Sequence, residues 1–467
     1  MDDVSATGGQ RPAYDRVVVT GLGVFSSIGV GVEEFTEGLR SGRNGVSPIT
    51  AFDTTGFDHA NGCEIRDFDP APWLRRWKQE ELGRTAQFSV AAARMAVADA
   101  GLTDEELRAR RVQVAVGTTD GESQDLDRLA ADWVAAGPET WDPETARRVG
   151  AGRLSAAVAS EFGLTDSEAV TLATACSAGN YAIGMGLDAL RVGDADIALC
   201  GGADAMCQKS FSAFYRLGTI APDFCRPFDK DRQGILTGEG AGVLVLERLD
   251  SALARGARIH AEVLGYGLTC DAHHPVQPNQ SSIARCMQLA LDDAGVAPQD
   301  VDLISAHGTG TRTNDVTESR AIRDVYDSAP PRTVSLKSML GHTMGAASAL
   351  AAVACSVALT EGFIPPTINH RETDPECEID CVPNESVPAR LRVVQNNGLA
   401  FAGNNAIVVL GHYPADSDSD SDSDAGSDSD AGSDSDAGSD SDAGSDSDAG
   451  SDSDADVDAA ADDVARS

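Results

Sequence analysis

The segment Thr171-Leu-Ala-Thr-Ala-Cys176-Ser-Ala-Gly-Asn180 places a cysteine between two kinds of secondary structure. Apolar and β-branched residues over 169–175 predict a buried strand, and the run from Tyr181 to Val192 predicts a helix. Cys176 therefore lies on a strand-to-helix turn. There a thiol faces the positive end of a helix dipole and free backbone N–H groups, which lower a thiol pKa and can stabilise an oxyanion. A cysteine after an apolar strand is also commonly a core residue, so the residues around Cys176 have to distinguish a catalytic from a structural role.

Outward from this segment, strands and helices alternate through the chain. The pattern predicts strands at 17–20, 112–116, 197–200, 303–306 and 406–411, and helices at 32–43, 282–294 and 346–361. Gly21-Leu22-Gly23 predicts a tight turn rather than a dinucleotide site, because the third glycine of that motif falls on Ser26. The order indicates an α/β fold of two related halves, 16–264 and 265–412, behind a flexible N-terminus at 1–15.

Composition agrees with this class and limits the partners. Of the 467 residues, 42% are hydrophobic and only 5% aromatic, as in cores of helices packed on sheets. The net charge is −38; residues 416–467 contribute 19 Asp and one Arg, and the remainder still carries 55 acids against 35 bases. We expect neither nucleic acid nor an anionic membrane as a partner, because binding to either depends on Lys and Arg.

The end of the chain, 413–467, differs from the rest. Five full copies of Ser-Asp-Ser-Asp-Ala-Gly fill 421–450, and they offer nothing that could form a core. We predict a disordered acidic tail. Calcium binding is disfavoured, because nonapeptide calcium repeats need an apolar position and a different glycine spacing.

Several features predict a soluble, cytoplasmic protein. The N-terminus lacks the basic and apolar regions of a secretory signal, and the apolar stretch at 346–359 is short for a membrane span. The ten cysteines show no tight pairing, which favours reduced thiols over a disulfide framework.

Two further polar clusters accompany Cys176. Ala306-His307-Gly-Thr-Gly-Thr311 follows a predicted strand, and Lys337-Ser-Met-Leu-Gly-His342 leads into the helix at 346–361. A lone histidine is as often structural as functional. Open α/β sheets, however, place their sites at the carboxyl ends of strands, so we expect the three clusters to meet. A thiol, two imidazoles and an amine form a nucleophile with hydrogen-bond donors aimed at a carbonyl.

These clusters, with Thr174-Ala-Cys176-Ser and Phe401-Ala-Gly-Asn-Asn405, occur in an order and approximate spacing that resemble the β-ketoacyl-acyl-carrier-protein synthases. Three further motifs are similar to that family's: Arg226-Pro-Phe-Asp229-Lys, Gly238-Glu-Gly-Ala-Gly242 and Pro365-Pro-Thr-Ile-Asn369. The resemblance covers about residues 16–412. It implies the thiolase-like fold, in which two duplicated halves form five α-β-α-β-α layers and usually assemble as a dimer.

The resemblance also implies a mechanism. Cys176 would take an acyl group from the phosphopantetheine thioester of an acyl carrier protein, with its own N–H and that of Phe401 as the oxyanion hole. His307 and His342, as neutral Nε2 donors, would hold the thioester oxygen of malonyl carrier protein while CO2 leaves. The carbanion would then attack the acyl-Cys176 carbonyl to give a 3-oxoacyl product.

The remaining roles follow from the same resemblance. Lys337 would tune the electrostatics around His307, Phe401 would act as a gate between the acyl and malonyl steps, and Thr309 and Thr311 would contact pantetheine. No cofactor and no metal are implied, since the substrates are carried on the acyl carrier protein. The partners would be that carrier protein and a second synthase subunit, in a homodimer or in a heterodimer with a chain-length partner.

Three departures from the family pattern favour a specialised, polyketide-type branch. Ala351 stands where the family has a glutamate, so Lys337 is expected to lose its acidic partner. The gating loop reads Ala400-Phe-Ala402-Gly403 where the elongation enzymes of the family have Gly-Phe-Gly-Gly, which should stiffen it, because alanine disfavours a positive φ. Val276 replaces a threonine often used for pantetheine.

Other functions explain fewer of these residues. A papain-like hydrolase could use Cys176, His307 and Asn405 but leaves His342 and Lys337 without a task. A thiolase needs a second cysteine near the C-terminus, and none follows Cys381. A noncatalytic chain-length subunit of a synthase heterodimer is the alternative from a different class, although such subunits usually lack the nucleophile.

Overall fold

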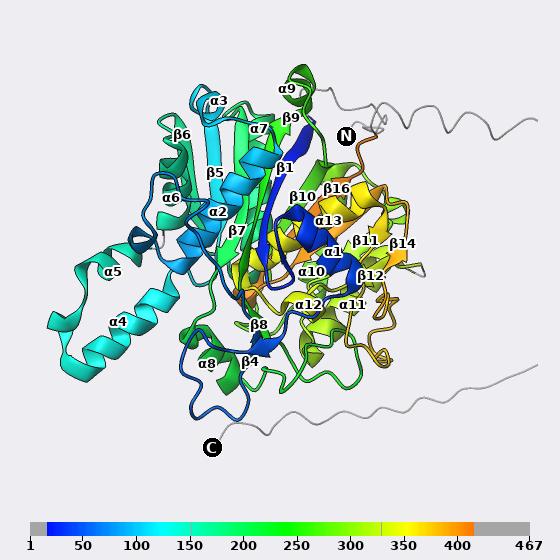
Figure 1. Ribbon diagram of the computed structural model, residues 1–467. Coiled ribbons are helices and arrows are strands. Elements are labelled where there is room, and N and C mark those ends of the chain that lie inside the picture. Colours follow the sequence, from blue (N-terminus) through cyan, green and yellow to red (C-terminus); the bar gives the residue numbers. More distant parts are fainter. Residues whose placement is uncertain (1–15, 151, 328, 415–467) are drawn as a thin grey trace, which may run out of the picture. The chain divides into compact units, whose positions relative to one another are not determined.

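One mixed β-sheet with helices on both faces forms most of the structure (Figure 1). The computed structural model describes residues 16–150, 152–327 and 329–414. The strands of the large sheet are β1 (Val17–Ser26), β2 (Gly29–Val30), β5 (Val112–Gly117), β6 (Ser167–Leu172), β7 (Ile197–Asp204), β9 (Gly240–Arg248), β10 (Ala261–Cys270), β11 (Leu303–Ser305), β12 (Arg332–Val334), β15 (Val393–Gly398) and β16 (Asn404–Gly411). Two small sheets contain β3 (Ser47–Pro48), β4 (Asn61–Cys63) and β8 (Thr237–Gly238), and β13 (Phe363–Ile364) and β14 (Val387–Pro388).

The helices alternate with these strands. They are α1 (Val32–Ser41), α2 (Arg84–Asp99), α3 (Asp104–Arg108), α4 (Ser123–Ala136), α5 (Pro143–Arg148), α6 (Arg153–Phe162), α7 (Ala178–Arg191), α8 (Gln208–Arg216), α9 (Leu249–Ala254), α10 (Gln280–Ala294), α11 (Arg312–Tyr326), α12 (Lys337–Leu340) and α13 (Ala347–Glu361).

The large sheet consists of two parts built on the same plan. The strands of the first part lie in the order β6-β5-β7-β9-β1, and those of the second in the order β12-β11-β15-β16-β10. In each part the three outer strands are parallel and the other two join antiparallel. The two parts meet where Val17–Val19 of β1 pairs with Ala261–Val263 of β10. Numbered within its own half, each part therefore has its third strand at the outer edge, followed by the second, fourth, fifth and first.

The two parts of the sheet and three sets of helices form five layers, in the order α-β-α-β-α. Helices α7 and α13 contact strands of both parts and form the middle layer, while α2 and α6 cover the first part and α10 and α11 the second. Most residues of α13 are buried, which agrees with its composition, since ten of its fifteen residues are Ala, Val or Leu. The predicted α/β, thiolase-like architecture of two duplicated halves is confirmed. The predicted limit between the halves, at 264/265, falls within β10 and stays a prediction.

The strand before Cys176 is not buried as expected. Strand β6 lies at the outer edge of the sheet, and its residues are half-buried or exposed. Its apolar and β-branched residues resemble those of a central strand, but only β5 pairs with it in the described chain. An open edge of this kind invites pairing with another chain.

The predicted turn at Gly21-Leu22-Gly23 is wrong, because both glycines lie inside β1. A Cβ on Gly21 would lie 2.1 Å from the carbonyl oxygen of Ala96, and one on Gly23 would lie 1.9 Å from that of Ala92. Helix α2 therefore packs directly on the backbone of β1. The glycines permit this close approach of helix and strand.

One helical segment, Met344–Glu361, is long and apolar enough to cross a membrane by length and composition. It is longer than the sequence suggested, because a short 3₁₀ turn precedes α13. Of this segment, 83% is buried inside the fold, which is the situation of a core helix. The predicted flexible N-terminus (1–15) and the predicted disordered tail lie outside the described residues, apart from Tyr413 and Pro414.

Candidate active site

The predicted site residues come from loops that leave the carboxyl ends of parallel strands. Cys176 follows β6, and His307 follows β11. Lys337 and His342 follow β12, and Phe401 follows β15. Because the two parts of the sheet share one plan, the third strand of each half leads into the loop before its central helix. Cys176 is thus the first half's counterpart of the His342 loop.

The correspondence extends to backbone geometry. A 3₁₀ turn precedes each central helix, η4 (Ala175–Ser177) before α7 and η6 (Met344–Ala346) before α13. Its first residue has a positive φ in both cases, 52° at Ala175 and 51° at Met344. Non-glycine residues adopt this left-handed conformation at a cost, and it is typical of sites where backbone position matters. The sharp turn at Ala175 sets Cys176 at the start of the middle-layer helix α7.

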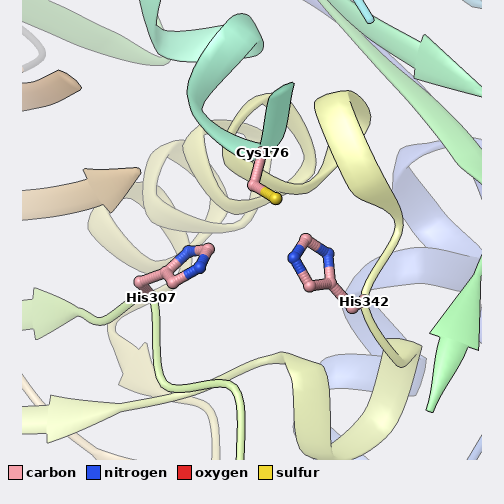
Figure 2. Close-up of side chains that lie close together, drawn as sticks. All are labelled: Cys176, His307 and His342. Carbon is pink, nitrogen blue, oxygen red and sulfur yellow. The ribbon is translucent and has the colours of Figure 1, made fainter. Parts of the chain in front are cut away.

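Cys176, His307 and His342 face one another across a small space (Figure 2). The thiol sulfur and one nitrogen of each imidazole lie within 4.8 Å of one another. The two rings are 5.5 Å apart between centroids and nearly perpendicular, at 83°. All three side chains are buried. The meeting of the three clusters expected from the sequence is therefore observed.

The expected lowering of the Cys176 pKa is wrong. Burial raises the pKa of the thiol to about 12, and the charges of Asp204 and Asp120 act in the same direction. Lys337 and a hydrogen bond from the Phe401 backbone N–H lower it, but by less than burial raises it. The sequence indicated the helix terminus correctly but gave no measure of how deeply the sulfur is buried. At neutral pH the resting thiol is protonated.

Both histidines are held in the neutral state. Burial, followed by the nearby charge of Lys337, holds the pKa of each imidazole well below its usual range, and His342 acts in the same direction on His307. Nδ1 of His342 accepts a hydrogen bond of 3.1 Å from the backbone N–H of Met344. A neutral ring whose Nδ1 is an acceptor carries its proton on Nε2. His342 is therefore an Nε2–H donor.

Ala351 had suggested that Lys337 would have no acidic group nearby, but the structure places Glu318 near it. Its ammonium donates a 2.6 Å hydrogen bond to the backbone carbonyl of His307. Burial lowers the Lys337 pKa, and the carboxylate of Glu318 acts in the opposite direction. Glu318 also accepts hydrogen bonds of 2.8 Å from the N–H groups of His307 and Gly308. One buried acid therefore supports both the lysine and the His307 loop.

Glu318 and Asp204 support the site but were not predicted from the sequence. Asp204 ends β7 and accepts a 2.6 Å hydrogen bond from the N–H of Gly345, in the turn after His342. It also accepts from Thr118 Oγ1 and from the N–H groups of Thr119 and Asp120. Burial, followed by the charge of Asp120, raises the Asp204 pKa to about 7. For Glu318, a signal existed: Asp315 lies in the first turn of α11 and Glu318 lies three residues later on the same face, and both accept N–H groups of the preceding loop.

Phe401 lies at the mouth of the site. Its side chain is 37% exposed and packs against Phe214, with ring centroids 5.5 Å apart. The next residue, Ala402, has a φ of 64°, so the alanine does adopt the left-handed conformation that a glycine would take without strain. Its N–H donates a 2.7 Å hydrogen bond to Pro275. Whether this substitution stiffens the loop stays a prediction.

A cavity of about 270 Å³ connects this centre to the surface. Cys176, both histidines and Phe401 line it, and so do Thr309 and Thr311, whose hydroxyls are 2.9 Å apart. Thr311 also caps α11 by accepting the Asn314 N–H. A role in pantetheine binding stays a prediction for both threonines.

The grouping of one thiol and two imidazoles is also compatible with a transition metal. A nitrogen that carries a proton cannot be a ligand, however, and the Met344 N–H directs the proton of His342 to Nε2. A metal at Nε2 would require the proton to move to Nδ1 and would break this hydrogen bond. The local chemistry therefore fits a pair of donors better than a pair of ligands.

Comparison with known proteins agrees with this geometry. Residues 14–252 match the family model "Beta-ketoacyl synthase, N-terminal domain", and residues 260–371 match "Beta-ketoacyl synthase, C-terminal domain". The chain belongs to the β-ketoacyl synthase family. Among curated proteins, this synthase is 38% identical to 3-oxoacyl-[acyl-carrier-protein] synthase 2 of Synechocystis sp. over 410 residues, which covers 85% of this chain and 98% of the relative.

Solved structures give the same assignment. One chain of the ishigamide ketosynthase/chain length factor structure is 62% identical to this synthase, with a TM-score of 0.85 and coverage of 85% of this chain and 99% of that one. A type II polyketide synthase ketosynthase, solved with its acyl-carrier protein and bound to the hexaketide, contributes a chain that is 30% identical, with a TM-score of 0.79 and coverage of 85% and 99%.

The raised Cys176 pKa predicts how the thiol reacts with iodoacetamide. Because only the thiolate reacts and the pKa is about 12, the rate at Cys176 should increase roughly tenfold per pH unit from pH 7 to pH 9. Lys337→Met should slow it at every pH, because removal of the positive charge raises the thiol pKa further. Peptide-resolved mass spectrometry measures the rate, with the exposed Cys270 as internal reference. A plateau near pH 7 would contradict the buried, protonated thiol.

Proposed function

We propose that this chain catalyses the decarboxylative condensation of an acyl thioester with malonyl carrier protein, giving a 3-oxoacyl carrier protein and CO2. The observation that carries the proposal is the convergence of Cys176, His307 and His342 on one space at the inner end of the cavity. We propose that the reaction needs no metal or other cofactor, because the acyl groups arrive as carrier-protein thioesters and the donors are supplied by the chain.

In the first step the sulfur of Cys176 attacks the carbonyl of the acyl thioester. The thiol proton passes to the departing phosphopantetheine sulfur, and an acyl-Cys176 thioester forms. The raised pKa of Cys176 suits an exchange in which the proton leaves as the new bond forms, rather than from a resting thiolate. The N–H of Phe401, which is directed at this sulfur, and that of Cys176 itself are the candidate oxyanion donors.

In the second step malonyl carrier protein occupies the vacated cavity. As its terminal carboxylate leaves as CO2, the electron pair of the broken bond forms an enolate, and negative charge develops on the thioester oxygen. Neutral Nε2–H groups of His307 and His342 would stabilise that charge better than water, because they are fixed before the charge appears. The enolate carbon then attacks the acyl-Cys176 carbonyl, and the released Cys176 sulfur takes a proton from solvent.

Fatty-acid or polyketide synthesis is the setting we propose, in a soluble, cytoplasmic enzyme. The likeness to a ketosynthase/chain length factor structure favours the polyketide branch and a heterodimer. The alternative, that this chain is the noncatalytic chain-length subunit, is disfavoured because it carries the nucleophile and both histidines in a buried, converging arrangement.

Strand β6 is the edge that we propose pairs with the second subunit. Asp166 and Leu172 accept hydrogen bonds from the N–H groups of Val112 and Thr118, on the β5 side. The N–H and C=O of one residue in a parallel strand point to the same side, so the even-numbered residues of β6 face β5. Ser167, Ala169 and Thr171 therefore present their N–H groups to the open edge.

The two histidines should be needed for decarboxylation and much less for loading. His307→Ala and His342→Ala should each lower CO2 release from malonyl carrier protein by about 100- to 1000-fold, the usual effect of removing one such donor. Intact-mass analysis should still show one acyl group on Cys176, and none in Cys176→Ser. If a variant released CO2 at the parent rate, the histidine replaced in it would have only a structural role. If both variants failed to load an acyl group on Cys176, a histidine would instead act as the base for Cys176.

Substitution of one residue at the β6 edge should separate the subunits. Ala169→Pro removes an outward N–H but no bond to β5, and proline is tolerated at such positions. We expect the variant subunit to stay folded, with little change in its melting temperature, and to lose pairing. Analytical ultracentrifugation measures pairing of the full chain, both alone and coexpressed with a synthase-like subunit that lacks the cysteine. Ala169→Ser, which retains the N–H, is the control. Pairing that survives Ala169→Pro would place the interface elsewhere.

A further inference from the structure

The loop between β10 and α10 forms one wall of the cavity mouth. Residues 274–278 of this loop line the cavity, as do Thr309, Thr311, Thr313 and Asn314. Its side chains on that wall are those of His274, Pro275, Val276, Gln277 and Pro278, so most of the wall offers no hydrogen bond. Val276 is apolar and 38% exposed, and its side chain cannot donate a hydrogen bond. A polar ligand that passes this wall has few side chains to bind.

Hydrogen bonds to Asp271 and Pro275 hold the loop in place. The carboxylate of Asp271 accepts hydrogen bonds of 2.7 Å from Asn405 Nδ2 and 3.0 Å from the N–H of Asn279. Pro275 accepts the N–H of Ala402, so the loop is also joined to the segment that carries Phe401. The acid of the loop is therefore directed inward, away from any anion at the mouth. The two prolines further restrict the backbone of residues 274–278.

His274 is fixed by the turn that it begins. Its Nδ1 accepts hydrogen bonds of 3.1 Å from the N–H groups of both Val276 and Gln277. These two backbone donors are thereby used within the loop. With Nδ1 as an acceptor, the neutral ring carries its proton on Nε2, so the exposed imidazole presents an N–H donor in a defined position at the cavity mouth.

We propose that Nε2–H of His274 donates a hydrogen bond to the phosphate of the phosphopantetheine arm. The inference rests on the proposed function, in which the arm enters with its sulfur toward Cys176. Its phosphate then remains at the outer end of the cavity, where His274 is exposed, while Thr309, 6% exposed, lies deeper. Because the chain outside 416–467 carries 55 acids against 35 bases, an anion at the mouth needs a positioned donor. His274 thus supplies on this wall the contact that Val276 cannot make.

The test compares two small substrates that differ only in the phosphate, malonyl-phosphopantetheine and malonyl-pantetheine, with CO2 release as the readout. His274→Ala should raise KM for the phosphorylated substrate roughly tenfold, the effect of one lost hydrogen bond to a charged group, with kcat nearly unchanged. KM for malonyl-pantetheine should not change. His273→Ala, an exposed neighbour that does not line the cavity, is the matched control.

A second variant separates binding from loop structure. In His274→Asn the side-chain oxygen can still accept the N–H groups of residues 276 and 277, as asparagine does in turns, but the Nε2–H donor is gone. We expect it to behave as His274→Ala does. Parent-like KM in His274→Asn, or an equal loss with malonyl-pantetheine, would overturn the phosphate contact. A parent enzyme that releases no CO2 from either thioester would instead contradict the proposed function.

Discussion

Helices α7 and α13 lie against each other in the middle layer, and the reactive groups are placed relative to that contact. The approach is close: a Cβ on Gly179 would lie 2.5 Å from the backbone nitrogen of Ala349. Asn180 fixes the alignment, since its N–H donates to Ser348 Oγ at 3.0 Å and its side chain exchanges hydrogen bonds with Asn396. These polar groups are buried and paired, so a shift of one helix would leave several of them unsatisfied.

This contact has a direct chemical consequence because each helix begins next to one reactive loop. Cys176 stands two residues before α7, and His342 stands five residues before α13. The same left-handed turn, at Ala175 and at Met344, precedes both helices. Duplication therefore supplies two equivalent positions, of which one holds the nucleophile. The other holds Gly345, whose N–H is bound by Asp204 and so ties the His342 loop to the first half.

Burial then sets the charges of the site. It raises the pKa of Cys176 and lowers that of both histidines, so the thiol and the imidazoles are neutral before substrate arrives. Lys337 acts on all three, and its own hydrogen bond goes to the backbone of His307. A site of neutral, fixed donors suits a reaction in which negative charge appears transiently on a thioester oxygen. A permanent imidazolium would instead bind the malonyl carboxylate and resist the loss of CO2.

The sequence predicted the α/β class, the alternating elements of both halves and the convergence of three clusters, because local patterns and the carboxyl-end rule are sufficient for these. It failed where the outcome depends on distant contacts. The glycines at 21 and 23 are needed because helix α2, about 75 residues away in the chain, packs on them. Asp204 binds the N–H of Gly345, which is 141 residues away. The depth of Cys176, and hence its pKa, likewise depends on both halves. The open edge of β6 could not be inferred from residues that suit a buried strand equally well.

The central claim is that the site forms a carbon-carbon bond. It is tested most directly by a single turnover, in which enzyme carrying an acyl group on Cys176 is mixed with malonyl carrier protein labelled with ¹³C at the methylene carbon. The account predicts one 3-oxoacyl thioester, two carbons longer and labelled between its two carbonyls, and one CO2 for each acyl group lost from Cys176. Release of the acyl group as a free acid, with no label joined to it, would contradict the account.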